Sequence, residues 1–449
     1  MSTIVALSTP KGRGAIGVIR LSGPLSLPIA NALTGVTSGF EPRRATLVHV
    51  LDPNSGTVLD EVIVTYFKSP QSLTGEDVVE IACHGSPAVI RQIIDSSLDL
   101  GARLAGPGEF TLRAVANGKI NLAEAEAIRD LIESQTQAAA KQAARQLNGE
   151  LSRTLEPLKK SLVEVIVVLE SALEFVEDDL PPSEADALVD QLVQVVHKLE
   201  LLESSYAKGQ LLHDGVKIAI TGPPNVGKSS LFNMLVTRDR AIVTDIPGTT
   251  RDTLTEAIDI GGIPVVLTDT AGLRETSDDI EALGIARTHQ AMSDADLVLL
   301  VIDGSVQPGP MEQMLISRRD EARRLLVINK CDLPNYSFPT GDAIESKCIR
   351  ISARTGEGLP QLHEAILEVF DSGSLESDGL LITNARHHEL LSSAKREIDC
   401  AVELLRERRS EELVLAPLHN SLKLLGQITG ETTTEDILAQ IFATFCIGK

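Results

Sequence analysis

The sequence predicts a multidomain α/β protein with three parts: an α+β domain, an all-α domain, and a nucleotide-binding module with a doubly wound sheet that interrupts the all-α domain. A glycine-rich loop at 222–229, between an apolar strand and a helix, predicts the module. Ala, Glu, Gln and Leu recur at helical spacing from 122 to about 208, and helices are expected again from 384. The expected segments are 1–118, 119–212, 213–375 and 376–449, of which the second and fourth form one helical domain.

The first 118 residues alternate short apolar runs with turns, which is typical of strands. Helix-like stretches at 26–33 and 87–100 lie among these runs, so the predicted class of this domain is α+β. The expected strands are 3–7, 17–21, 45–50, 61–67 and 77–82.

Aliphatic strands alternate with helical segments from residue 217 onward, and this alternation predicts a doubly wound, largely parallel sheet. Gly261-Gly262 is expected to turn one hairpin on that sheet. The expected strands are 217–221, 263–268, 296–302, 325–328 and 348–352.

Composition restricts the classes of function. The formal net charge is −22, which disfavours broad, non-specific attraction to a polyanion, so any RNA contact must be local or helped by a partner. The five cysteines include no C-x-x-C pair, which indicates neither a disulfide framework nor a zinc site. The sequence has no signal-peptide pattern and no apolar run of about 18 residues, so we expect a soluble, cytoplasmic protein without membrane contact.

The loop Gly222-Pro223-Pro224-Asn225-Val226-Gly227-Lys228-Ser229 has the spacing G-x-x-x-x-G-K-S of a phosphate-binding loop. Its glycines allow backbone N–H groups to converge on phosphate oxygens, and the N-terminus of the following helix adds positive potential. Lys228 would reach the outer phosphates, and Ser229 would hold Mg²⁺ through its hydroxyl.

Further motifs follow in the order expected of a guanine-nucleotide hydrolase. Thr250 offers Mg²⁺ a second hydroxyl, and Asp269 ends a strand as a carboxylate on a magnesium-bound water should. Asp332 can accept two hydrogen bonds that guanine donates and adenine does not, and the segment 352–354 brings a backbone N–H to the guanine oxygen. The expected GTP and GDP contacts are Asn225, Val226, Gly227, Lys228, Ser229, Ser230, Thr244, Asp245, Ile246, Pro247, Gly248, Thr249, Thr250, Asp269, Thr270, Ala271, Gly272, Asn329, Lys330, Asp332, Ser352, Ala353 and Arg354.

These motifs predict a Ras-like P-loop GTPase domain with one difference. Leu273 follows the Asp-Thr-Ala-Gly motif, where a signalling GTPase of the Ras type has a glutamine that orients the attacking water. Leucine has no polar atom for that task. Another group must therefore orient the water, and another cation must stabilise the charge of the transition state.

Specific motifs resemble those of the bacterial tRNA-modification GTPase family MnmE, also called TrmE. The resemblance begins with Asn225 in the phosphate loop, the loop 244–252 and the segment 269–275, and it includes the closing sequence Cys446-Ile447-Gly448-Lys449. The N-terminal signatures that match are Pro10-Lys11-Gly12-Arg13-Gly14, Gly75-Glu76-Asp77-Val78-Val79-Glu80, His84-Gly85 and Gly106-Pro107-Gly108-Glu109-Phe110-Thr111. The resemblance therefore spans the whole chain.

The resemblance implies a homodimer whose G domains use K⁺ in place of an arginine finger. Asn225 would bind this ion through its side chain, together with Thr244, Ile246 and Thr249. The water-orienting residue of the family corresponds to Glu281, and Lys228 completes the hydrolytic set. Judged without the resemblance, Glu281 is a solvated helix carboxylate.

The resemblance also implies that the N-terminal domain binds a tetrahydrofolate one-carbon donor, either 5-formyl- or 5,10-methylene-tetrahydrofolate. Arg20, Glu80, Lys119 and Lys449 would hold its pterin and glutamate ends. With an FAD-containing partner of the MnmG type, the family installs an aminomethyl or carboxymethylaminomethyl group on carbon 5 of the tRNA wobble uridine. Cys446 belongs either to that chemistry or to packing.

Two alternative functions remain open at the level of sequence. An Era-like ribosome-assembly GTPase shares the G-domain motifs but normally carries a basic RNA-binding domain, and this acidic chain has no such segment. A folate-binding scaffold with a regulatory G domain would bind the same ligands without contributing to tRNA chemistry. Nucleoside analysis of tRNA separates the scaffold from the modification enzyme.

Overall fold

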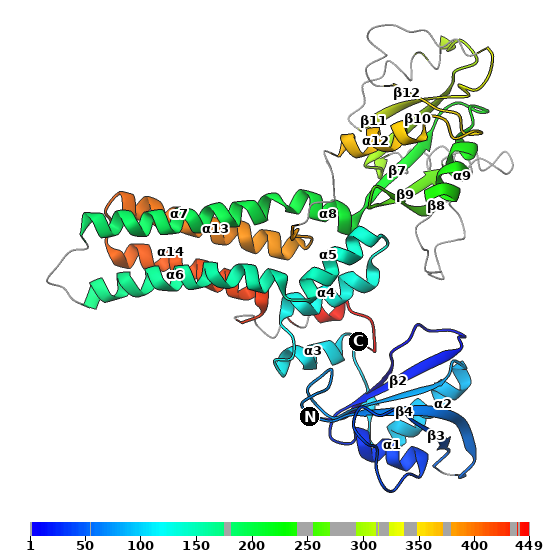
Figure 1. The fold of residues 1–449 in the computed structure, drawn as a ribbon, viewed down its shortest axis with the longest axis vertical. Helices are drawn as coiled ribbons and strands as arrows, with labels where there is room; N and C mark the ends of the chain where they lie inside the picture. Colours follow the sequence, from blue (N-terminus) through cyan, green and yellow to red (C-terminus); the bar gives the residue numbers. More distant parts are fainter. Residues whose placement is uncertain are drawn as a thin grey trace. The chain divides into compact units, whose positions relative to one another are not determined.

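A computed structural model describes residues 2–53, 55–174, 181–239, 255–269, 293–310, 313, 323–335, 348–370, 379–431, 438 and 441–448. The chain divides into two compact units. The first unit comprises residues 1–129 and 423–449, and the second comprises 130–422. Figure 1 shows a sheet in each unit and a group of long helices in the second.

The first unit contains a six-stranded sheet of order β3-β4-β5-β2-β1-β6 among its described residues. The pairs are antiparallel except β1 with β6. The short strand β6 was not predicted, because two residues give no alternation to read. The strands are β1 (Ile4–Leu7), β2 (Ile16–Ser22), β3 (Thr46–Leu51), β4 (Val58–Phe67), β5 (Val78–His84) and β6 (Arg103–Leu104).

Alternation along the strands gives this sheet two different faces. One face packs on α1 (Ser26–Thr34) and α2 (Pro87–Asp99) in a shared apolar core. On β1, Val5 belongs to that core, whereas Ile4 and Ala6 pack with Phe110 of α3 (Glu109–Ala116) on the other face. The polar residues of β2 and β5 that alternate with core residues therefore lie on the face that α3 covers.

The C-terminal segment joins the first unit through both backbone and side chains. Ile447 forms a β-bridge with Pro107, and the Gly108 N–H donates to the carbonyl of Cys446 at 3.3 Å. Phe442 and Phe445 pack with Leu122 and Ala125 of α4 (Leu122–Glu133). Gly108 has φ 61°, and a Cβ atom there would lie 2.8 Å from Cβ of Phe445.

The sheet of the second unit has the order β12-β11-β10-β7-β9-β8. The pairs are parallel except β8 with β9, a hairpin that turns at Gly261-Gly262 as the sequence predicts. Apolar residues of α9 (Lys228–Asp239) and α12 (Leu359–Val369) share one core with alternating strand residues, so both helices cover the same face. The strands are β7 (Val216–Thr221), β8 (Thr255–Ile260), β9 (Ile263–Asp269), β10 (Leu297–Asp303), β11 (Arg324–Asn329) and β12 (Cys348–Arg350).

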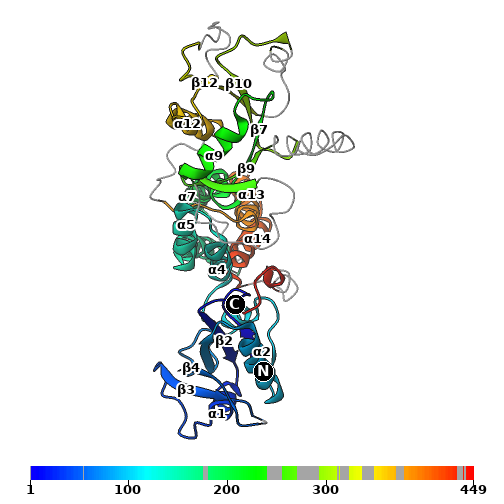
Figure 2. The same ribbon diagram turned by 90° about the vertical axis from the view of Figure 1, so that its right-hand side faces the viewer.

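Long helices precede and follow this sheet along the chain, and Figure 2 shows α5, α7, α13 and α14 grouped together. The fold class is thus a multidomain α/β protein with an all-α part and a doubly wound P-loop domain, as the sequence predicts. The four domain boundaries stay a prediction. The helices are α5 (Gln137–Leu147), α6 (Glu150–Glu174), α7 (Pro182–Ser204), α8 (Tyr206–Asp214), α13 (Ala385–Arg406) and α14 (Glu411–Thr429).

Among the described residues, no helix combines the length and apolarity that a membrane crossing requires.

Candidate functional sites

The phosphate loop connects the end of β7 to the start of α9, and two of its glycines cannot be replaced without a clash. Gly222 has φ 146°, and a Cβ atom there would lie 2.2 Å from the carbonyl oxygen of Val301. Gly227 has φ 97°, and its Cβ would lie 2.3 Å from Nδ2 of Asn329. Only glycine allows the backbone to pass this close to its neighbours in a left-handed conformation.

Lys228 and Ser229 begin α9 at the mouth of this loop. The buried Lys228 donates from Nζ to the carbonyl of Pro223 at 2.7 Å. Ser229 donates from Oγ to Oδ2 of Asp269 at 2.9 Å. Asp269 is the last residue of β9, which pairs with β7, the strand before the phosphate loop. A hydroxyl and a carboxylate this close together form a suitable oxygen donor set for Mg²⁺.

Asn329, at the end of β11, connects the phosphate loop to the segment 352–354. Its side chain is buried; Nδ2 donates to the carbonyl of Val226 at 2.8 Å, and Oδ1 accepts from the N–H of Ala353 at 2.9 Å. Because a buried amide with two specific partners has little rotational freedom, Asn329 fixes the distance between the two loops.

Asp332 is the carboxylate expected to recognise guanine. Ser352 donates from Oγ to Oδ1 of Asp332 at 2.7 Å, and Arg354 lies 2.9 Å from Oδ2. The Ser352 hydrogen bond is the largest cause that holds the pKa of Asp332 below its usual value, and Arg354 acts in the same direction. Asp332 is therefore ionised at neutral pH, as an acceptor of two N–H groups must be.

Asp303 is a residue of this site that the sequence analysis missed. It ends β10 beside Asn329 in the parallel register, and its carboxylate forms an ion pair with Lys330. Burial raises the pKa of Asp303, but the bonds from Lys330 and Ser305 outweigh burial and lower the pKa below the usual value. Its position at the carboxyl end of a predicted strand was the available signal.

Lys330 also contacts the phosphate loop. Its Nζ donates to the carbonyl of Asn225 at 3.0 Å, and both residues have left-handed backbones, with φ 66° and 62°. A non-glycine residue with a left-handed backbone in each of the two loops indicates that surrounding contacts hold the shape of both loops.

Several predicted site residues lie outside the part of the chain that the structure describes. They are Thr244, Asp245, Ile246, Pro247, Gly248, Thr249, Thr250, Thr270, Ala271, Gly272, Glu281 and Lys449. Ser230, in contrast, lies in the first turn of α9.

In the first unit, Arg20 and Glu80 are direct partners across β2 and β5. Nε and Nη2 of Arg20 lie 2.9 and 2.7 Å from Oε1 of Glu80, and the guanidinium lies over the Phe110 ring at 5.7 Å from its centroid. Nη1 of Arg20 donates to the carbonyl of Gly448 at 3.4 Å, so the C-terminal segment reaches this pair.

Lys119, predicted to bind folate, and Cys446, predicted to belong either to the modification chemistry or to packing, have different surroundings. Lys119 donates from Nζ to the carbonyl of Pro70 at 2.9 Å on the surface of the first unit. Cys446 is exposed, and the Ser8 hydroxyl donates to the carbonyl of Gly448 at 3.0 Å two residues further along. An exposed cysteine argues against the packing alternative for Cys446.

The phosphate loop, the Ser229–Asp269 pair and the Ser352–Asp332 pair lie at the carboxyl edge of a largely parallel sheet, and together they define a P-loop GTPase. A family model described as the MnmE helical domain matches residues 122–446, and one described as the GTP-binding protein TrmE N-terminus matches residues 3–119. The chain belongs to the MnmE family of tRNA modification GTPases.

Curated relatives are similar along their full length. The tRNA modification GTPase MnmE of Koribacter versatilis is 47% identical, with 100% of this chain and 99% of the relative covered. That of Aquifex aeolicus is 41% identical, with 99% of each covered. Among solved structures, the G domain of the T. maritima FeoB iron transporter is 31% identical, with a TM-score of 0.25, and covers 34% of this chain and 97% of its own.

Proposed function

We propose that the chain is a K⁺-dependent GTPase that hydrolyses GTP to GDP and phosphate to drive modification of the tRNA wobble uridine. The observation that carries the proposed GTP hydrolysis is the 2.9 Å contact between Ser229 and Asp269 beside the phosphate loop. The full-length relatives named as tRNA modification GTPases support the proposed role in tRNA modification and favour it over ribosome assembly.

The described residues divide the work of binding GTP. Lys228 would neutralise the outer phosphates, and Asp332 would accept the two N–H groups of guanine. Ser229 would hold Mg²⁺ together with the predicted ligand Thr250, and Asp269 would accept from a magnesium-bound water. Mg²⁺ held there would supply positive charge to the phosphate oxygens. Asn329 keeps the guanine-binding and phosphate-binding loops at a fixed separation.

We further propose that K⁺ binds Asn225 with Thr244, Ile246 and Thr249, and that Glu281 orients the attacking water. The support is the resemblance to the MnmE family, together with Leu273, which has no polar atom to orient water. Asn225 lies in the phosphate loop, where its backbone carbonyl accepts from Lys330 at 3.0 Å, and the resemblance to the family gives its side-chain amide oxygen the role of cation ligand.

Hydrolysis rates in K⁺ and Na⁺ test this proposal. Replacing Na⁺ by K⁺ should raise turnover about tenfold or more, because one fixed cation at the developing charge is worth a few kcal/mol. Glu281→Ala should remove most hydrolysis while the affinity for GTP changes little. Equal turnover in both salts would exclude the K⁺ requirement.

For the first unit we propose a tetrahydrofolate site at Arg20, Glu80, Lys119 and Lys449, used with an FAD-containing partner of the MnmG type. Arg20 suits a carboxylate, and Glu80 can accept from the amino group and ring N–H of a pterin. Cys446, exposed beside the segment that reaches Arg20, would take part in the chemistry. Nucleoside analysis of tRNA from cells that lack the protein tests this assignment. The wobble modification should be lost in these cells and restored by complementation, whereas the folate-scaffold alternative predicts that it is unchanged.

We also propose a homodimer. Leu47 and Ile63 are cross-strand partners on β3 and β4 and are 65% and 45% exposed. A paired apolar surface at the edge of a sheet suits contact with a second copy. Sedimentation should give twice the chain mass, and Leu47→Asp with Ile63→Asp should shift it toward the monomer.

A further inference from the structure

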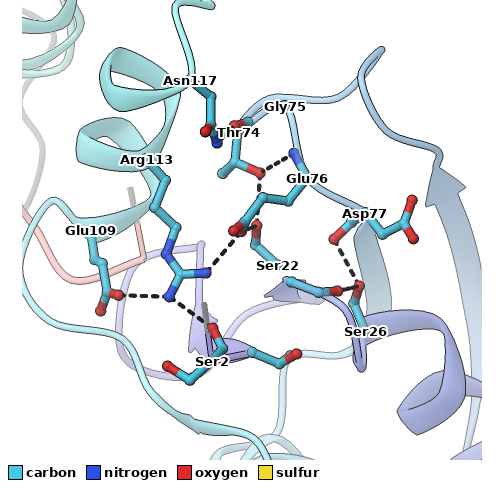
Figure 3. Close-up of polar contacts among 12 residues, drawn as sticks. Ser2, Ser22, Ser26, Thr74, Gly75, Glu76, Asp77, Glu109, Arg113 and Asn117 are labelled. Carbon is cyan, nitrogen blue, oxygen red and sulfur yellow. Dashed lines mark hydrogen bonds and ion pairs between the residues drawn. The ribbon is translucent and has the colours of Figure 1, made fainter.

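Arg113 is a buried cation between two carboxylates in the first unit. It lies on α3 with only 6% of its surface exposed. Nη1 donates to Oε2 of Glu76 at 2.8 Å, and Nη2 donates to Oε1 of Glu109 at 2.9 Å and to the carbonyl of Ser2 at 2.9 Å (Figure 3). A guanidinium this well paired fixes the positions of the groups around it.

Glu76 connects this cation to the loop 69–77. Its Oε2 also accepts from the hydroxyl of Ser22 at 2.7 Å, and that hydroxyl lies 2.7 Å from Oγ1 of Thr74. Ser22 and Thr74 are both fully buried. The loop is therefore held from below by β2 and from the side by Arg113 (Figure 3).

The same loop is in contact with Lys119. Asn117 donates from Nδ2 to the carbonyl of Thr74 at 2.7 Å, and Lys119 donates to the carbonyl of Pro70. A Cβ atom at Gly75 would lie 3.3 Å from Cγ of Lys119. The loop thus determines where the lysine side chain lies.

The helix of Arg113 also reaches Arg20. Phe110, three residues before Arg113, is fully buried under the Arg20 guanidinium. Arg20 and Ser22 are two residues apart on β2 and therefore lie on the same face of the sheet. Arg20 and Lys119, the two cations of the proposed folate site that the structure describes, accordingly rest on elements that Arg113 joins.

We infer that Arg113 is a positioning residue of the folate site, acting through Glu76 and the loop 69–77 on Lys119; this rests on the proposed folate function. A lysine side chain loses rotamer freedom when it binds an anion, and this loss lowers the affinity. A fixed loop restricts the lysine before the ligand binds, so less entropy is lost on binding. If the loop loosens, binding must order it as well, and the affinity falls. Arg113 needs no contact with the ligand for this effect.

Titration calorimetry of the full chain with 5-formyl-tetrahydrofolate tests the inference. Arg113→Lys keeps the charge but cannot reach Glu76, Glu109 and Ser2 together, so we expect about tenfold weaker binding. Arg103→Lys is the matched control, since Arg103 also pairs with Glu109 but is 49% exposed and forms no bond to Glu76. Its affinity should stay within about twofold of the wild type.

A double-mutant cycle with Lys119→Ala separates positioning from general destabilisation. If Arg113 acts through Lys119, the two losses combine to less than their sum, whereas independent effects add. If Arg113→Lys strongly lowers the unfolding temperature, Glu76→Gln takes the place of Arg113→Lys in the same cycle. Glutamine keeps the shape of the Glu76 side chain and one oxygen that accepts hydrogen bonds.

Each outcome is informative. Absence of folate binding by the wild type rejects the folate site itself. Normal binding by the wild type together with unchanged binding by Arg113→Lys, or with strictly additive losses, overturns the positioning role alone.

Discussion

The nucleotide site and the proposed folate site are built in opposite ways. The nucleotide site depends on backbone geometry: Gly222 and Gly227 allow close approaches that any Cβ atom would block, and its motifs are short segments at strand ends. The proposed folate site depends on side-chain ion pairs between distant segments, such as Arg20 with Glu80 and Arg113 with Glu76. A site of the first kind should fail completely after one small substitution, whereas one of the second kind should weaken by degrees.

The largest expected effect follows Gly227→Ala. The methyl group would meet Nδ2 of Asn329 at 2.3 Å while the backbone remains at φ 97°, so the loop must move. We expect at least a hundredfold loss of GTP affinity, measured by fluorescence titration. Gly39→Ala is the control, since Gly39 also has positive φ, 74°, but no atom within 4 Å of the added methyl group. Normal GTP binding by Gly227→Ala would contradict the backbone argument.

A side chain within the backbone-built site should have a smaller and more specific effect. Asp332→Asn removes an acceptor of guanine N–H groups, and we expect about a hundredfold weaker GTP binding. Xanthine carries an oxygen where guanine carries an amino group, so the asparagine amide should bind xanthosine triphosphate better than the wild type does. Competition between the two nucleotides measures the change in specificity, and an unchanged ratio would count against Asp332 as the guanine-binding group.

The sequence could predict most of the nucleotide site because its residues are consecutive. The phosphate loop, the Asp269 strand end and the Asn329–Asp332 motif are local patterns whose spacing carries the geometry. Asp303 was missed although it follows a predicted strand, because its pairing with Lys330 depends on the strand order that places β10 beside β11. Local spacing does not encode which strands are neighbours.

The first unit shows the same limit more strongly. Five strands and two helices were predicted from alternation and spacing, and these elements are present. The bonds of Arg113 were not predicted, because they join residues 37 and 111 positions apart. The two-residue strand β6 was not predicted either, because it is too short for alternation and pairs with the distant strand β1. The signatures around Glu76 and Glu109 were recognised as motifs in the sequence. Only the structure shows what the two motifs share: both carboxylates pair with Arg113.

The smallest expected effect is a pH dependence in an ion-pair network of the second unit. His213, at the end of α8, lies 3.3 Å from Oδ1 of the buried Asp130 and 2.8 Å from Oδ1 of Asp214. The hydrogen bond with Asp130 is the largest cause that raises the pKa of His213 to about 9; burial opposes it, and Asp214 adds to it. Because the pKa is higher in the folded than in the unfolded state, this stabilisation is complete below about pH 6.5 and is lost as the pH rises through 9.

The thermal unfolding midpoint of the wild type should therefore fall more steeply between pH 7 and pH 9.5 than that of His213→Gln. The difference should correspond to about 1 kcal/mol, because the partly exposed imidazole and Asp214 are screened by water. His49→Gln is the control, since His49 and its partner Glu61 are both more than half exposed. Parallel pH curves for the wild type and His213→Gln would show that the interactions of His213 with Asp130 and Asp214 add nothing to stability. The pH dependence of stability would then not distinguish side-chain networks from the site built on backbone geometry.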